Sequence, residues 1–572
     1  MEKKQAQRKI KSIIPQRVWI NKEHIYVDFI KKRYKVLPKL DLKKSENEIN
    51  SRLKQLKFFE SLDSSLLIKV FKTLKYAREL DLSNMFPWDK PYSPSKTIYF
   101  AKRMSNAQVI RIPDLKKLTE NFKGQSEFWM KYAKKAQVFG YSCDLCYYRT
   151  DPNLFNQSSN GSTFVHLIRY QPQIKDLTVQ FYLRGQLLPE AYFNFERYPP
   201  HLERLSLRGI MVDKDVPSLI HHLKSLKHFE ISFHAKATSV FIFVLIKQLA
   251  LLSNLQSLAL SMKQDPSLVF SKKTSFKSLV SLRLCFQSEI ANLANILGAF
   301  TECPLRHLRL RAKIKSDHEF IQIANFIANY KKLERLQLKI ICWDEFRSWG
   351  PLTQLLHQID GLPLLTRLSV SIFPLSRFKF SQKATLPFAQ LFTKPVLLKS
   401  LKLYFQGFIV SKQDFLQLLK TLERYTLTLR KLRIDIGKCE LNQIEFRTVL
   451  RFIKSFPKIR SLQFRDLRIS SEYFLKSLAE AVDQLPYLEK FAVGKISDEQ
   501  VRETILISTV ERILKKRGLR KFFCCVSYFY YKNGPFDKSL RLNLATIQKI
   551  NPYLEKFPDI PIFDMNDYDI DI

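Results

Sequence analysis

A short apolar motif, L-x-x-L-x-L, recurs along most of this 572-residue chain and limits its fold more than any other feature. Phe, Ile, Val or Cys replaces Leu at some positions. The motif occurs about 13 times between residues 173 and 535, and successive copies lie 24 to 33 residues apart. One such motif says little in a leucine-rich chain, but a near-regular series indicates an internal structural repeat.

Each copy of the motif predicts a short strand followed by a helix. Its last two apolar residues are two positions apart, so they point to the same face of a strand. The stretches between copies, such as 320–330 and 415–422, carry apolar residues at helical spacing. Stacked units bury a continuous core that one unit cannot bury alone. The sequence predicts an α/β solenoid, and the two-residue period argues against the alternative of a purely helical array.

The series resembles the leucine-rich-repeat family over about residues 173–530. The resemblance implies a horseshoe-shaped solenoid with parallel strands on the concave face and helices on the convex face. Spacings near 29 residues are similar to the ribonuclease-inhibitor-like and F-box-associated repeat types. The chain departs from the family in one respect, because the Asn or Cys expected just after each motif is mostly missing.

The flanks divide into three further segments. Residues 1–57 are basic and polar, residues 58–172 predict a helical N-terminal cap or insertion, and residues 536–572 predict a C-terminal cap with an acidic tail. Within the second segment, residues 58–82 predict an amphipathic helix and then a strand at Leu80 and Leu82. That segment is a displaced or capping repeat, or an F-box-like module of the kind that precedes such repeats; the usual Leu-Pro start is absent.

The chain is strongly basic. Lys and Arg number 95 against 53 Asp and Glu, which gives a net charge of +42. One interpretation is a polyanionic partner. The other is coding bias, because the chain is also rich in Phe and Tyr. Composition alone does not separate the two.

Motifs that carry catalysis or cofactor binding are absent from the sequence. No G-x-G phosphate loop, H-E-x-x-H or G-x-S-x-G pattern occurs, and the single C-x-x-C at Cys143 and Cys146 lacks a second pair for zinc. We therefore expect no enzyme activity, no cofactor, no metal and no small-molecule substrate. Scattered cysteines, no apolar run of membrane-spanning length and no secretory signal predict a cytoplasmic protein, with the nucleus as the alternative.

The solvent-facing positions of the predicted strands flank and separate the two inward residues of each motif. Basic residues outnumber acidic ones at these positions. The candidate partner-binding residues are Arg283, Arg309, Arg311, Arg335, Lys339, Arg367, Lys402, Lys431, Arg433 and Arg465. Arginine offers a planar fork to carboxylate or phosphate.

These observations predict a non-catalytic scaffold that recognises an acidic protein partner on a basic leucine-rich-repeat face. One alternative is a substrate receptor that binds a ubiquitin-ligase adaptor through residues 58–82. Another is a protein associated with RNA or a ribonucleoprotein. Only Tyr404 and Phe523 offer aromatic rings at the predicted face positions, and this scarcity favours a protein partner over nucleic acid.

Overall fold

A computed structural model gives the fold in two compact units, residues 1–279 and 280–572. The structure describes residues 17–20, 25–28, 33–36, 79–81, 108–112, 138–144, 174–182, 198–210, 220–233, 239–262, 276–289, 293–342, 350–374, 397–405, 411–435, 439–464, 467–468, 472–497 and 521–527, together with a few residues between 505 and 519. Each unit is described by itself below.

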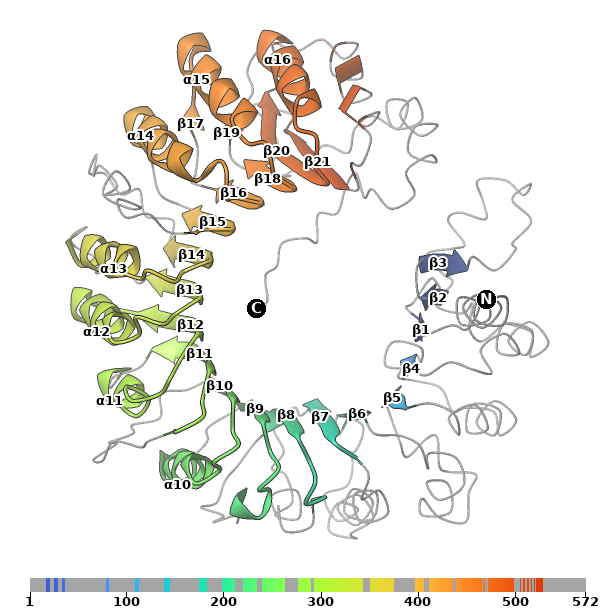
Figure 1. Ribbon diagram of the computed structural model, residues 1–572, viewed down its shortest axis with the longest axis vertical. Coiled ribbons are helices and arrows are strands. Elements are labelled where there is room, and N and C mark those ends of the chain that lie inside the picture. The colour runs from blue at the N-terminus through green and yellow to red at the C-terminus, as the bar shows by residue number, and fades with distance from the viewer. Residues whose placement is uncertain are drawn as a thin grey trace, which may run out of the picture. The chain divides into compact units, whose positions relative to one another are not determined.

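The first unit contains a largely parallel sheet (Figure 1). Strands β1 (Arg17–Ile20), β2 (Ile25–Asp28) and β3 (Arg33–Val36) pair antiparallel in sequence, and β1 also pairs parallel with β4 (Glu79–Asp81). From β4 each strand pairs parallel with the next, through β5 (Val109–Ile112), β6 (Val138–Asp144), β7 (Asp176–Tyr182), β8 (Arg204–Ile210), β9 (His228–Phe233) and β10 (Ser257–Met262). The described helices of this unit are η5 (Ile220–His222) and α10 (Ser239–Ala250).

The parallel sheet of the first unit begins upstream of residue 173, where we expected the repeats to start. Strands β4, β5 and β6 have no full L-x-x-L-x-L motif, yet they join the same parallel ladder as β7. Strand β4 lies inside residues 58–82, at the strand predicted around Leu80. The helix predicted for the rest of that segment lies outside the described residues, as does the C-terminal cap and acidic tail at 536–572.

The second unit alternates parallel strands with helices. Its main sheet contains β11 (Ser281–Glu289), β12 (His307–Ile314), β13 (Arg335–Cys342), β14 (Arg367–Pro374), β15 (Ser400–Phe405), β16 (Lys431–Asp435), β18 (Ser461–Phe464), β20 (Lys490–Ser497) and β21 (Lys521–Ser527), each parallel to the one before. Strands β17 (Cys439–Glu440) and β19 (Leu467–Arg468) form a separate small pair. The helices are α11 (Leu293–Gly298), α12 (Asp317–Ala328), α13 (Gly350–Asp360), α14 (Lys412–Leu422), α15 (Gln443–Lys454) and α16 (Glu472–Asp483), with η7 (Glu423–Tyr425) after α14.

These helices form one layer along one side of the strands in the second unit (Figure 1). The predicted α/β arrangement of parallel strands alternating with helices is therefore confirmed. Helix starts follow ordinary capping chemistry. In α15, for example, the Asn442 side chain accepts a hydrogen bond from the Glu445 backbone N–H at 2.9 Å, and the Glu445 carboxylate accepts one from the Asn442 N–H at 2.6 Å.

Alternating burial explains why the motif forms strands. In β12, Leu308, Leu310, Ala312 and Ile314 are buried and the residues between them are half-buried. These apolar side chains and the buried faces of the helices form one core, because the repeat brings equivalent positions together in every unit. The predicted inward residues of the motif are buried wherever the structure describes their side chains between Ile174 and Leu488.

Several strands run past the end of the motif. Strands β12 and β13 pair over eight residues, from His307 opposite Arg335 to Ile314 opposite Cys342. The chain continues as a strand beyond the motif, and the ladder hydrogen bonds satisfy its backbone groups. The longer strands also add half-buried outward positions to the sheet face.

No helix among the described residues is long and apolar enough to cross a membrane.

Truncating a core leucine should destabilise the second unit strongly. Leu338 in β13 is 0% exposed, so Leu338→Ala removes buried surface and leaves a cavity. We expect a loss of about 2–5 kcal/mol in the free energy of unfolding, measured by urea denaturation followed by circular dichroism. Ile444→Ala, at a residue that is 76% exposed, is the control and should change it by less than about 0.5 kcal/mol. Equal effects would contradict the inward assignment of the motif.

Candidate functional site

The ladder of the second unit arranges the outward positions of its strands in three rows, which we call the basic rows. The first row contains His307, Arg335, Arg367, Ser400 and Lys431. The second contains Arg283, Arg309, Gln337, Ser369, Lys402 and Arg433. The third contains Arg311, Lys339, Ser371, Tyr404 and Asp435. Parallel strands lie roughly 5 Å apart, so residues of one row are close neighbours.

Like charges face each other repeatedly in these rows. The directly opposed pairs are Arg283 and Arg309, Arg311 and Lys339, Arg335 and Arg367, and Lys402 and Arg433. No Asp or Glu occupies these three rows from β11 to β15; the first is Asp435 in β16. Directly opposed like charges destabilise a sheet by about 0.2–1 kcal/mol per pair. Each of these opposed pairs, taken by itself, therefore acts against the stability of the sheet.

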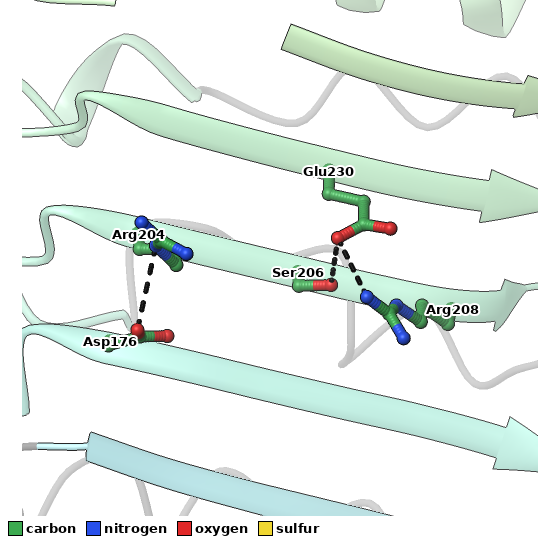
Figure 2. A network of polar contacts seen from close by, with 5 residues as sticks. All are labelled: Asp176, Arg204, Ser206, Arg208 and Glu230. Carbon is green, nitrogen blue, oxygen red and sulfur yellow. Dashed lines mark hydrogen bonds and ion pairs between the residues drawn. The ribbon is translucent and has the colours of Figure 1, made fainter. Parts of the chain in front are cut away.

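The corresponding face of the first unit is built differently (Figure 2). The Arg204 Nε lies 3.5 Å from the Asp176 Oδ2 on the neighbouring strand. The Arg208 Nη2 lies 3.0 Å from the Glu230 Oε2, which also accepts a hydrogen bond from the Ser206 hydroxyl at 3.0 Å. Arg204 and Arg208 of β8 are thus each paired with a carboxylate of a neighbouring strand. Basic face residues of this chain are not all available to a partner.

An aromatic pair lies at the far end of the basic rows. The rings of Phe373 and Tyr404 are 4.7 Å apart between centroids. The Lys339 Nζ lies 5.4 Å from the Phe373 centroid, and the Arg433 guanidinium carbon lies 5.7 Å from that of Tyr404. Cation–π contacts of this kind hold the basic groups over the face. Arg433 also lies 4.0 Å from the buried carboxylate of Asp435.

The pKa of His307 is affected by the cations of this face. Burial lowers the pKa of His307 below its ordinary value of 6.5, and the Arg335 guanidinium lowers it further. Glu334 acts in the opposite direction, while Arg367 and Arg306 add to the lowering. His307 therefore stays neutral in the folded protein at pH values where the unfolded chain binds a proton.

Nine of the ten predicted site residues lie among the described residues, and all nine fall on the basic rows. The tenth, Arg465, lies outside the described residues. The ten predicted residues include neither His307 nor Phe373. His307 is basic only when protonated, and Phe373 lies beyond the motif. The period-two pattern continuing through Ala312, Ile314 and Ile372 is the signal that could have extended the strands.

Other chemistry has little support in the described part of the chain. A shallow cavity near the end of α16 is lined by Asp483, Ser508, Arg512 and Lys516. Its charges satisfy one another, since the Arg512 Nε lies 2.7 Å from the Asp483 carboxylate and Lys516 donates to the Asp483 carbonyl. Among the described residues no three metal-ligating side chains cluster. Cys143 lies in β6, and Cys146 lies outside the described residues.

Comparison with known proteins gives no assignment: no protein-family model matches the chain, and no curated protein matches it significantly.

Relieving one like-charge pair should stabilise the second unit. Arg335 and Arg367 are opposed and exposed, so Arg367→Gln removes their repulsion. We expect the free energy of unfolding to rise by roughly 0.2–1 kcal/mol at low ionic strength. The gain should vanish in about 1 M salt, where the screening length is roughly 3 Å. Denaturation at the two salt concentrations measures it, and a loss of stability at low salt would show that Arg367 has a stabilising partner.

Neutralising Arg335 should raise the pKa of His307 toward 6.5, because the guanidinium is one cause of its lowering. NMR titration of labelled histidines, assigned with His307→Gln, measures the shift; Arg451→Gln on α15 is the control. The pH dependence of stability follows from the same shift. Because the pKa of His307 is lower in the folded than in the unfolded protein, the free energy of unfolding falls as the pH drops below about 6.5. Arg335→Gln should make that fall smaller. If the pKa of His307 is the same in Arg335→Gln as in the natural protein, the two side chains do not interact in solution and the prediction is wrong.

Proposed function

We propose that this chain is a leucine-rich-repeat solenoid that binds an acidic segment of a protein partner on the basic rows of its second unit. The fold class is supported by parallel strands that alternate with helices and by motif residues that are buried in register. The role is recognition rather than catalysis. It requires no cofactor.

The observation that carries the proposal is the series of directly opposed like charges on the three basic rows, which hold no Asp or Glu from β11 to β15. Glu289 of β11 lies opposite Lys313, one position beyond these rows. Sheets normally place opposite charges across strands, as β7, β8 and β9 of this chain do. A surface that retains repulsion gains stability when an anionic partner covers it. The partner then places its carboxylates along the basic rows.

A protein partner is favoured over nucleic acid by the state of the aromatic rings. Binders of single-stranded nucleic acid offer aromatic faces on which bases stack. Phe373 and Tyr404 instead pack on each other and lie beneath Lys339 and Arg433. Their rings hold cations in place, which suits recognition of carboxylates.

Nucleic acid is the second candidate, because arginine rows suit phosphate as well as carboxylate and the chain carries a net charge of +42. The adaptor-binding alternative depends on residues 58–82, of which the structure describes only β4. We propose a cytoplasmic location, with the nucleus as the alternative.

Charge reversal on the basic rows tests the proposal. The variant carries Arg309→Glu, Arg311→Glu and Arg335→Glu, and the tagged protein is used to capture partners from a native extract split into nuclease-treated and untreated halves. We expect a nuclease-resistant set of proteins that the variant captures on the order of tenfold less well, because three attractive charges become repulsive. Its thermal midpoint should not fall, and it should rise at low ionic strength because each reversal replaces a like-charge pair with an opposite-charge pair.

The matched control reverses three exposed cations on the helical layer, Lys420, Arg451 and Lys476, which changes the net charge equally. It should capture the partner set as the natural protein does. Equal loss in both variants would mean that net charge alone drives capture. Capture that disappears with nuclease would assign the face to nucleic acid, and undiminished capture by the first variant would refute the proposal.

A further inference from the structure

A further row, which contains both acidic and basic residues, runs along the starts of the strands in the second unit, next to the three basic rows. It consists of the residue just before each strand, and we call it the strand-start row: Arg306, Glu334, Thr366, Lys399, Arg430, Arg460 and Glu489. Backbone hydrogen bonds of 2.8 to 2.9 Å join each member to the next from Arg306 to Glu489. The row is therefore a continuous ladder.

Most charged members of the strand-start row form ion pairs with their neighbours in the row. The Arg306 Nη1 lies 3.3 Å from the Glu334 carboxylate, and the Arg460 Nη1 lies 3.5 Å from that of Glu489. The same position in the first unit is also paired, because the Lys227 Nζ lies 2.9 Å from the Glu203 carboxylate. Alternating charge at this position is thus the ordinary state of the repeat.

Lys399 and Arg430 are the exception. They are adjacent members of the row, both are exposed, and neither forms an ion pair with any described residue. Between Glu334 and Glu489 the strand-start row has no acidic member. The interruption covers the starts of β15 and β16. It adjoins Arg367, Lys402 and Lys431 of the basic rows.

An exposed apolar ridge lies at the same place. Leu364, Leu397 and Leu427 are 52%, 69% and 66% exposed, in the turns that lead into β14, β15 and β16. These turns stack on each other, since the Lys399 N–H donates to the Thr366 carbonyl at 2.8 Å and the Thr428 hydroxyl donates to the Leu398 carbonyl at 3.0 Å. Three leucines in consecutive turns form a patch rather than scattered surface residues.

The ridge is bounded by charged residues. Leu364 and Leu397 directly precede the first leucine of their motifs, and Lys332 and Lys458 occupy that position in flanking repeats. Exposed leucines and unpaired cations therefore coincide over β14 to β16 and are replaced by lysines or ion pairs on both sides. Two independent irregularities of the repeat mark one surface.

We infer that this surface, the ridge with Lys399 and Arg430, holds an acidic segment that also carries large apolar side chains. This rests on the proposed function and specifies its partner. Apolar side chains cover the three leucines, while Asp or Glu residues engage the strand-start cations and the adjoining basic rows. Three turns span roughly 10 Å, the length of about three extended residues. A phosphodiester chain would satisfy the cations but would leave the leucines in water.

Selection from a library of random short peptides displayed on phage tests the inference with the full-length protein. We expect the natural chain to enrich peptides that combine Asp or Glu with Leu, Ile, Phe or Met. The ridge variant, with Leu364→Gln, Leu397→Gln and Leu427→Gln, should retain the acidic preference and lose the apolar one. Its affinity for the best selected peptide should fall about tenfold. The charge variant, with Lys399→Glu and Arg430→Glu, should lose the acidic preference.

Controls on the helical layer exclude general effects. Ile444→Gln replaces an exposed apolar residue of α15, and the pair Arg451→Glu with Lys476→Glu matches the charge change; both should select as the natural chain does. The ridge leucines are exposed, so unchanged thermal midpoints are expected for the ridge variant.

The remaining outcomes separate this inference from the proposed function. Enrichment of acidic peptides without apolar residues would refute the role of the leucine ridge in binding and would leave the proposed function standing. Absence of any acidic enrichment would overturn both. A labelled oligouridylate that binds more tightly than the selected peptides, and is insensitive to the ridge variant, would assign the surface to nucleic acid and overturn the inference.

Discussion

The parallel ladder between successive repeats is the constraint on which the rest of this structure depends. It places each residue opposite the residue at the same position of the next repeat, as Leu308 lies opposite Leu336 and Leu336 opposite Leu368. The residue type at one position of the repeat therefore meets the residue type at the same position of the next repeat, all along the sheet. Apolar positions become a continuous core, and exposed positions become rows whose chemistry accumulates.

Accumulation has opposite consequences for apolar and charged residues. Stacked leucines stabilise the fold, whereas stacked arginines repel one another unless the neighbouring strand supplies a carboxylate. Strands β7 to β9 supply it through Asp176 and Glu230, and the strand-start row supplies it through Glu334 and Glu489. The three basic rows hold no Asp or Glu from β11 to β15, and the strand-start row has none at Lys399 and Arg430. The concentration of like charge is thus confined to one part of the repeat series.

The period of the motif was enough to predict the strands, the buried residues and nine members of the basic rows, because a two-residue alternation depends only on local geometry. It could not predict where a strand ends, so Phe373 was missed. It also could not predict which arginines are paired, because pairing depends on the residue one repeat away. Aligning the repeats reveals Arg204 opposite Asp176 and Arg335 opposite Arg367. Strand β4 lies at the strand predicted around Leu80, whereas β5 and β6 lack the full motif and are placed in the sheet by their backbone pairing.

The composition of the basic rows bears on whether the charge of this chain serves a partner. The chain contains 61 Lys and 34 Arg, so a bias that inserts basic residues without regard to position would fill the face mainly with Lys. Seven of the ten candidate residues are Arg instead. Arginine binds carboxylate in a bidentate geometry and lies well over aromatic rings, as Arg433 does over Tyr404. The preference for the more specific cation, at positions where charge costs stability, is what selection for an anionic partner would leave behind.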